Sequence, residues 1–152
     1  MKLEEVLKMS KFKNENHKAG LNILYTAWWL KTQSSTELKK FGLTHEQYNV
    51  LRILKGKYPE QMCVKDVASR VVEKNSNVPR IADRLEIKKL VKRTQSLTDG
   101  RHTLITITDA GLSILEAATK RLDLVMDDHV NFNQKDATTL NILLEKIREK
   151  EK

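Results

Sequence analysis

The chain lacks several features that would place it among secreted or membrane proteins. It has one cysteine, Cys63, which excludes an internal disulfide framework. No uninterrupted apolar run approaches the roughly 20 residues that a membrane span needs, and the N-terminus lacks the apolar core of a signal peptide. We therefore expect a cytoplasmic protein that does not engage a membrane.

Residues that interrupt helices are also scarce. The 152 residues include two prolines and five glycines, and aromatic side chains make up 5%. Leu, Lys and Glu are common, and this mixture favours helices. With 39% hydrophobic and 32% charged residues, the chain is expected to fold rather than to remain disordered. Its length suits one ordinary domain, or a small domain carried on dimerising helices.

No constellation of residues points to enzymatic chemistry. The four histidines, at positions 17, 45, 102 and 129, show no spacing typical of metal ligands. Nothing resembles a P-loop, a dinucleotide fingerprint or a nucleophile elbow. We therefore expect no metal, no cofactor and no enzymatic activity. Cys63 lies among apolar neighbours, so a buried, unreactive thiol is favoured over a redox sensor.

Positive charge is in excess and unevenly distributed. Lys and Arg number 28 against 20 Asp and Glu, a formal net charge of +8. Residues 1–60 and residues 61–105 each carry a net +5, whereas residues 106–152 carry a net −2. A positively charged surface formed by such residues attracts polyanions. Taken alone, the charge is equally well explained as a solvated Lys-rich surface.

The first part of the chain predicts two helices. Residues 1–16 are weakly amphipathic and predict a helical arm or a frayed end. A long helix is predicted over His17–Lys40, and it is apolar around more than half its circumference, which calls for cover from a second copy of the chain. Gly42 suits the left-handed backbone conformation that often ends an α-helix. Thr44 and Gln47 then form a capping box that starts a helix running to about residue 57.

The middle of the chain predicts a helix-turn-helix followed by a hairpin. A short strand at 62–64, a helix over 65–72 and a turn at 73–75 lead to a second helix, expected from an N-cap at Ser76 to about Lys89. Strands at 91–93 and 103–107 flank a loop that contains Asp99 and Gly100. Thr108 then caps a pair of helices, roughly 109–130 and 134–150.

The second of these helices has two distinct faces. Apolar residues occupy one side, and the opposite side carries Asn77, Arg80, Arg84 and Lys88. Arg binds guanine bidentately, Asn binds adenine, and both bind phosphates. A basic helix face is usually a solvated surface, but its place directly before a hairpin favours insertion into a DNA major groove.

The hairpin tip supplies a second indication of DNA binding. Arg101 can extend from the tip into the adjacent minor groove, and Asp99 can hold a neighbouring arginine such as Arg93. The alternative is an ordinary surface turn with an incidental ion pair.

Residues 43–115 resemble the winged-helix core of the MarR family of bacterial transcription regulators. The matching residues, in the order and spacing of that family, are Leu43-Thr44-x-x-Gln47-Tyr48-x-Val50-Leu51, Val64-x-x-Val67-Ala68, Asn75-Ser76-Asn77-Val78-x-Arg80, Asp83-Arg84-Leu85-Glu86, Leu90-Val91-x-Arg93, Asp99-x-Arg101 and Leu104-x-x-Ile107-Thr108-x-x-Gly111. Two positions depart from the family pattern: Pro79 replaces a common Thr or Ser, and Lys89 replaces the glycine usual before the wing.

The resemblance implies a mainly α-helical fold with a small β wing. Its winged helix-turn-helix domain would span residues 41–108, between dimerisation helices in residues 1–40 and 109–152. It implies a sequence-specific, DNA-binding homodimer on a pseudo-palindromic site of double-stranded DNA. The implied DNA-binding residues are Ser76, Asn77, Arg80, Arg84, Lys88 and Arg101, with Arg93 and Asp99 supporting the wing.

Two further expectations concern partners. Relatives of this kind respond to small aromatic or anionic effectors, and a pocket lined by His17, Tyr25, Trp28, Trp29 and Arg52 would suit one. The competing interpretation places both Trp side chains in the core or the dimer interface. A different class of function, a winged-helix interaction module that antagonises another regulator, also stays open, as does the choice between repression and activation.

Overall fold

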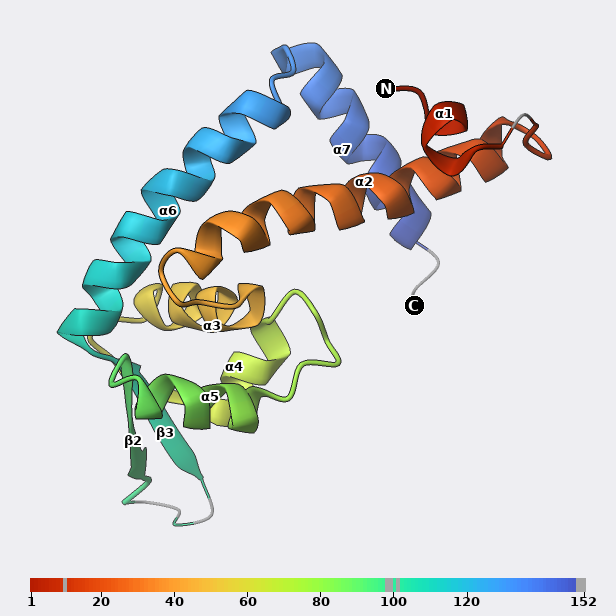
Figure 1. Ribbon diagram of the computed structural model, residues 1–152. Coiled ribbons are helices and arrows are strands. Elements are labelled where there is room, and N and C mark those ends of the chain that lie inside the picture. The colour runs from red at the N-terminus through yellow and green to blue at the C-terminus, as the bar shows by residue number, and fades with distance from the viewer. Residues whose placement is uncertain (10, 98–99, 101, 150–152) are drawn as a thin grey trace.

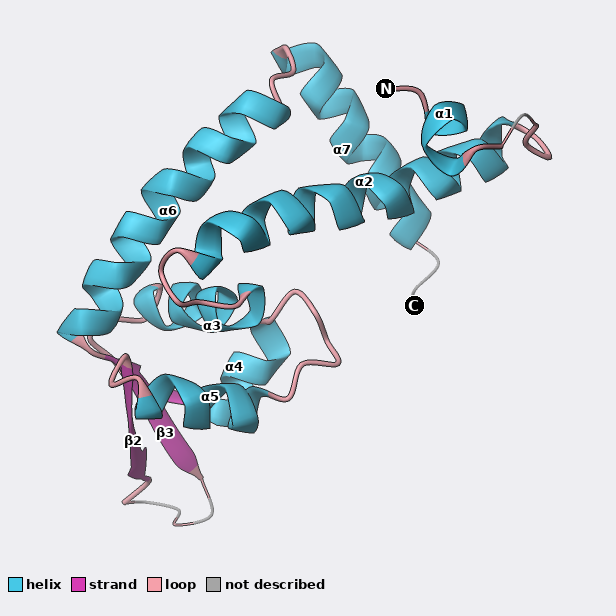
Figure 2. Cartoon of the chain, viewed as in Figure 1, coloured by secondary structure: helices cyan, strands magenta, loops and turns pink. Residues whose placement is uncertain are grey.

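Helices form most of the structure, and a small sheet projects from one end (Figure 1). This computed structural model describes residues 1–9, 11–97, 100 and 102–149. Figure 2 distinguishes the helices from the strands by colour. The elements are α1 (Leu3–Leu7), α2 (Glu15–Lys39), α3 (His45–Lys55), β1 (Met62–Cys63), α4 (Val64–Arg70), α5 (Val78–Ile87), β2 (Val91–Gln95), β3 (Thr103–Ile107), α6 (Asp109–His129) and α7 (Gln134–Arg148).

The junction between α2 and α3 forms as its sequence predicts. Gly42 adopts a φ of +65°, the left-handed conformation that glycine accepts at little cost. Thr44 then caps α3: its hydroxyl accepts from the backbone N–H of Gln47 at 3.2 Å. The Gln47 side chain accepts from the backbone N–H of Thr44, also at 3.2 Å, which completes the capping box. The start of α3 is therefore fixed by local chemistry.

The sheet has three antiparallel strands in the order β1-β3-β2. The pair β2–β3 runs in register from Val91 opposite Ile107 to Gln95 opposite Thr103, and Met62 of β1 lies opposite Ile105. Because β2 continues to Gln95, the hairpin is two residues longer on that side than the sequence predicts. The strands β2 and β3 extend away from the helices as a wing (Figure 2).

One hydrophobic core lies within the winged helix and extends along α6 as far as Leu122. It receives side chains from the C-terminal end of α2, from α3, α4 and α5, from the sheet and from α6. Its largest fully buried members are Leu38, Leu51, Leu54, Leu85, Ile105 and Leu115. The fold is therefore mainly α-helical with a small β wing, as expected.

The long helices beyond this core leave much apolar surface exposed. Buried residues in α2 are confined to Ser34 and Leu38, and α7 has none. Figure 1 shows α6 leading away from the winged helix and α7 turning back toward α2. Large apolar side chains that remain at least 40% exposed on these helices include Leu24, Trp28, Leu124, Met126, Leu140, Ile142, Leu143 and Ile147.

The end of α5, the start of β2 and the start of α6 meet at one point. The backbone N–H of Leu90 donates to Leu85 at 2.9 Å, and that of Lys89 donates to Glu86 at 2.8 Å. This pairing is the Schellman motif, which requires a left-handed residue, and Lys89 takes that conformation with a φ of +60°. Thr108 ties α6 to the same turn, because its hydroxyl donates to the Lys89 carbonyl at 2.8 Å.

Replacing Lys89 with glycine is expected to raise the free energy of unfolding by about 1 kcal/mol. The left-handed conformation strains any side chain that carries a Cβ, and Lys89 is exposed, so little packing is lost. Chemical denaturation at fixed protein concentration measures the change. The same substitution at Lys92, which is exposed within β2, should lower stability instead, because glycine weakens a strand. Equal effects at both positions would contradict the argument.

Candidate nucleic-acid interface

Helix α5 begins one residue later than its sequence predicts. Asn77, not Ser76, is the N-cap, and its side-chain oxygen accepts from the backbone N–H of Arg80 at 3.1 Å. Ser76 is half-buried in the preceding turn, where its N–H donates to the Glu73 carbonyl at 3.0 Å. Both side chains can cap a helix, so residue type alone did not choose between them. The cap occupies one of the atoms with which Asn77 would bind adenine.

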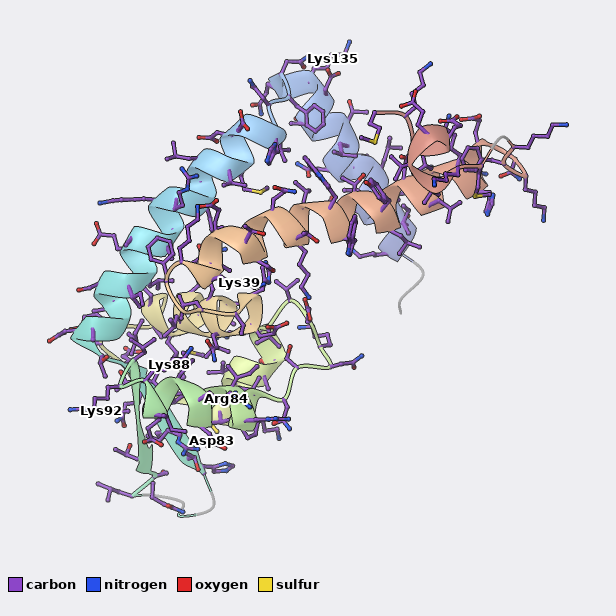
Figure 3. All side chains as sticks on the ribbon, in the orientation of Figure 1. Lys39, Asp83, Arg84, Lys88, Lys92 and Lys135 are labelled. Carbon is purple, nitrogen blue, oxygen red and sulfur yellow. The ribbon has the colours of Figure 1, made fainter. Side chains whose placement is uncertain are left out.

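The two faces of α5 are separated as the helical wheel predicts. Val78, Ala82 and Leu85 are buried in the core, and Arg80 and Arg84 are exposed. Within the described residues neither guanidinium forms a salt bridge, so each is available to an outside acceptor. Figure 3 labels Arg84 on α5, on the same part of the molecule as the wing.

A hollow of about 480 Å³ borders this basic face. It lies between α5, the start of α3 and the turn before α5. Most of the residues that line it are of polar type, and they include Thr44, Gln47, Ser76, Asn77, Arg80 and Arg84. The sequence-predicted residues Ser76, Asn77, Arg80 and Arg84 are therefore brought together on one surface.

Lys88 lies apart from that group. Its ammonium donates to the Gly42 carbonyl at 2.5 Å and to the Gln47 side-chain oxygen at 3.0 Å. These contacts join the end of α5 to the loop between α2 and α3. Lys88 therefore has a structural role here, which the helical wheel did not predict because both partners lie about 40 residues earlier in the chain.

Arg93 of β2 is held by two carboxylates of α5. It pairs with Asp83, and its Nη2 atom lies 2.7 Å from Oε2 of Glu86. The hydrogen bond with Glu86 and the charge of Asp83 raise the pKa of Arg93. The sequence suggested Asp99 as a partner, and that suggestion stays a prediction; among the described residues the partners of Arg93 are Asp83 and Glu86 of α5. Asp99 and Arg101 lie outside the described residues.

Cys63 is half-buried rather than buried, which corrects the sequence-based prediction. Its sulfur lies 3.8 Å from Nδ1 of His102, the residue directly before β3. The apolar neighbours of Cys63 in the sequence had indicated full burial. The strand pairing instead places it at the margin of the sheet, near the first turn of α5.

The side chains predicted to line an effector pocket do not converge. Tyr25 and Trp29 line a hollow of about 320 Å³ between α1 and α2. Trp28 is 59% exposed, with its ring 5.4 Å from that of Tyr25. Arg52 is on α3, where its guanidinium lies 5.9 Å from the Tyr48 ring.

The fifth residue predicted to line the effector pocket also lies elsewhere. His17 is in the first turn of α2, where its N–H donates to the Asn14 cap at 2.9 Å and its side chain is exposed. Within the described residues of one chain, these five side chains do not line a single pocket. Residue type identified aromatic and basic groups, but it carried no information about which of them meet in space.

A different hollow, of about 450 Å³, lies between α2 and α6. Glu37 of α2 accepts from Arg121 at 2.6 Å and from Lys40 at 2.8 Å. These two bonds lower the pKa of Glu37 to about 2, with the larger effect from Arg121. At the edge of the hollow the Trp29 and His129 rings lie 4.8 Å apart. Sequence reasoning missed this site because Glu37 and Arg121 are 84 residues apart.

The Glu37 carboxylate predicts an acid-sensitive contribution to stability. Its pKa is lower in the folded protein than the ordinary 4.5, so the contribution is complete above pH 4.5 and is lost as the pH falls toward 2. Glu37→Gln is therefore expected to be less stable than the parent near pH 7, with a difference that shrinks through this window. Thermal unfolding of both proteins from pH 2 to pH 7 measures it. A difference independent of pH would contradict the assignment.

A second ion pair connects α2 to the helix-turn-helix. Lys31 of α2 lies 2.5 Å from a carboxylate oxygen of Glu73, in the turn before α5, and 3.7 Å from Glu46 of α3. The hydrogen bond to Glu73 is the main cause of the raised pKa of Lys31. The long α2 helix therefore contacts the segment that positions α5.

Comparisons with known proteins agree with this arrangement. The family described as transcriptional regulator SarA/Rot matches residues 32–118, more than half of the chain. The regulator PapX of Escherichia coli, described as an HTH-type transcriptional regulator, is 32% identical over 93 residues, which span 59% of this chain and 56% of PapX. The chain thus matches about half the length of that relative.

Solved structures share the fold. AbsC, a MarR family transcriptional regulator from Streptomyces coelicolor, superposes with a TM-score of 0.80 at 22% identity, covering 92% of this chain and 97% of AbsC. MepR of S. aureus, solved as a DNA complex, superposes with a TM-score of 0.76 at 22% identity, covering 90% of this chain and 97% of MepR.

The three-stranded sheet with its wing and the helix-turn-helix give this chain the winged-helix fold of solved MarR-family regulators. More particularly, the chain belongs to the SarA/Rot family of transcriptional regulators. No helix in the described part of the chain is long and apolar enough to cross a membrane.

Proposed function

We propose that this protein is a homodimeric, sequence-specific DNA-binding regulator that reads a pseudo-palindromic site with two copies of α5. The observation that carries the proposal is the exposed pair Arg80 and Arg84, four residues apart on one face of a recognition helix whose other face is buried. Guanidinium groups four residues apart project from the same side of a helix, and each can bind guanine or a phosphate. The protein would act in the cytoplasm, and no enzymatic step is part of the proposal.

The wing supports the same docking geometry. Arg93 joins β2 to α5 through Asp83 and Glu86, so the wing and the recognition helix are held in a fixed relation. Its single positive charge also offsets part of the negative charge of these two carboxylates, which would otherwise repel the DNA backbone. When α5 occupies a major groove, the wing reaches toward the neighbouring minor groove. A minor-groove contact by Arg101 is part of this proposal.

Dimerisation is supported by α7. This helix has no buried residue, although Leu140, Ile142, Leu143 and Ile147 are large, apolar and 40–62% exposed. An isolated helix of 15 residues is marginal in water unless packing stabilises it. A second copy of the chain would cover this surface together with the exposed apolar residues of α2. In such a dimer, the two recognition helices would lie on the order of 34–36 Å apart, one turn of DNA.

The hollow between α2 and α6 is the place where we propose that an effector binds. It is bounded by the helices that connect the dimerisation region to the winged helix, and it contains Arg121 and His129. An anionic or aromatic ligand could compete with Glu37 for Arg121 and so alter the angle between α2 and α6. That change would alter the spacing of the recognition helices and release DNA.

Fluorescence anisotropy tests the DNA-binding proposal. The protein is titrated into a labelled duplex enriched by the protein from a random library, and into a scrambled duplex, at several salt concentrations. A preference of about 10³-fold with a steep dependence on salt is expected. Equal, weak binding to both duplexes would contradict the proposal and favour the alternative of a protein-interaction module.

Sedimentation equilibrium tests the dimer independently of DNA. The parent protein is expected at twice the chain mass, and a double substitution Ile142→Lys and Leu143→Lys should shift it toward the monomer, because charges would be buried at the interface. Lys135→Glu, at the start of the same helix, is a control for altered charge on α7. A monomeric parent at all concentrations would overturn the dimer.

A further inference from the structure

The first turn of α5 presents one rigid apolar side chain to the solvent. Pro79, its second residue, is exposed between the buried Val78 and the exposed Arg80. Proline has no N–H to donate, and its ring fixes φ. The side-chain oxygen of Asn77 is already engaged in capping the helix. The exposed part of this turn therefore offers one long hydrogen-bonding side chain, Arg80, and one apolar ring.

Pro79 faces the wing side of the recognition helix. It precedes Asp83 by four residues, so the two lie on the same side of α5, and Asp83 pairs with Arg93 of β2. Pro79 also lines a hollow of about 220 Å³ between α5 and the sheet, together with Lys65, His102 and Thr103. The ring thus lies on a flank of the helix, about 100° around its axis from Arg80.

A helix in the major groove directs its flanks toward the edges of the bases near the groove walls. The thymine C5 methyl is the apolar group that base pairs present there, whereas cytosine presents an N4–H₂ donor at the neighbouring position. A proline ring can contact the methyl but cannot accept from the donor. Because the ring is rigid, the contact costs little side-chain entropy.

We propose that Pro79 contacts a thymine methyl in each half-site and thereby selects thymine over cytosine at that position. This inference rests on the proposed DNA-binding function and adds a residue that determines specificity through apolar contact. Arg80 and Arg84 would contribute polar readout and charge, and Pro79 would contribute discrimination by shape. The two contributions differ in their response to salt, because an apolar contact releases no counterions.

Deoxyuridine provides a direct test, because it differs from thymidine by the absence of the methyl group. The whole 152-residue chain first selects a preferred duplex from a random library. Each thymine of that duplex is then replaced in turn by deoxyuridine in both half-sites. Anisotropy titrations give the ratio of affinities for the thymine and deoxyuridine duplexes, for the parent protein and for Pro79→Ser. Each ratio compares two duplexes with the same protein, so a general loss of affinity in the variant cancels.

For the parent protein, replacing one particular thymine per half-site by deoxyuridine is expected to lower the affinity by about fourfold for each contact. This is the value for burying one methyl group. In Pro79→Ser that ratio should fall to about one while the ratios at other thymines stay unchanged. Ile87→Ser is the matched control, since Ile87 is an exposed apolar residue, 80% exposed, at the opposite end of α5. It should preserve the parent ratio at every thymine.

Two results would overturn the inference in different ways. If the selected duplex is strongly preferred over scrambled DNA but every ratio is the same in the parent and in Pro79→Ser, the role of Pro79 is refuted and DNA binding stands. If the library yields no preferred sequence, the proposed function fails, and the inference fails with it.

Discussion

Gly111→Ala is expected to lower the free energy of unfolding by roughly 2–4 kcal/mol, one of the largest effects of a single methyl group in this protein. A Cβ at this position would lie 2.2 Å from the Leu90 carbonyl oxygen and 2.7 Å from Cγ1 of Ile107. The Leu90 oxygen cannot move freely, because it accepts from the Thr108 N–H at 3.1 Å. The first turn of α6 would have to shift away from the wing, which breaks this bond.

Denaturant unfolding at fixed protein concentration measures the loss, since the stability of an oligomer depends on concentration. Gly20→Ala is the matched control. Gly20 lies within α2, and no atom is within 4 Å of an added Cβ. Alanine is the better helix former, so this variant should be at least as stable as the parent. A Gly111→Ala protein with parental stability would show that the close contact at Leu90 is not maintained in solution.

Arg84→Ala and Arg80→Ala are each expected to weaken binding to the preferred duplex by roughly 10- to 100-fold. Both residues are exposed, so the fold should retain its stability. The pattern of the loss distinguishes two kinds of contact. Loss of a guanine contact reduces discrimination at one base pair. Loss of a phosphate contact weakens binding to all sequences, and it lowers the slope of the logarithm of the binding constant against the logarithm of the salt concentration by about one. Anisotropy at four or more salt concentrations separates them.

Lys135→Ala is the control for these two variants. It removes the same charge at the start of α7, far from α5, as Figure 3 shows for the labelled Lys135 and Arg84. Its effect on affinity should stay within about twofold, because charges separated by more than a Debye length are largely screened. An equal loss in Lys135→Ala would indicate that overall charge, rather than the face of α5, determines binding.

The sequence predicted the parts of the fold that local chemistry determines. The capping box of Thr44 and Gln47, the left-handed Gly42 and the cap at Thr108 all formed where expected. These signals lie within three or four residues of their partners, so no tertiary information is needed to interpret them. The two faces of α5 were predicted for the same reason, since the helical repeat alone separates Arg84 from Leu85.

Contacts between distant segments were not predictable in this way. The partners of Lys88, the partners of Arg93 and the pairing of Glu37 with Arg121 depend on how helices pack. The positions of the residues predicted to line an effector pocket have the same origin, because residue type does not tell which side chains of a long helix meet others in space. Cys63 was misplaced because its apolar neighbours indicated burial, while the edge of a short strand left it half-exposed.

The end of α5, the start of β2 and the start of α6 meet at Leu90, and this joint has a mechanical consequence. The helix α6 has 21 residues and is therefore about 31 Å long. Because its first turn is fixed to the end of α5 and to the base of the wing, it behaves as a lever. A displacement of about 3 Å at its far end corresponds to a rotation of about 5° at the joint, and moves a side chain 10 Å from the joint by about 1 Å. Hydrogen bonds to base edges tolerate only a few tenths of an ångström, so a small motion among the long helices is enough to misalign the surface that we propose faces DNA.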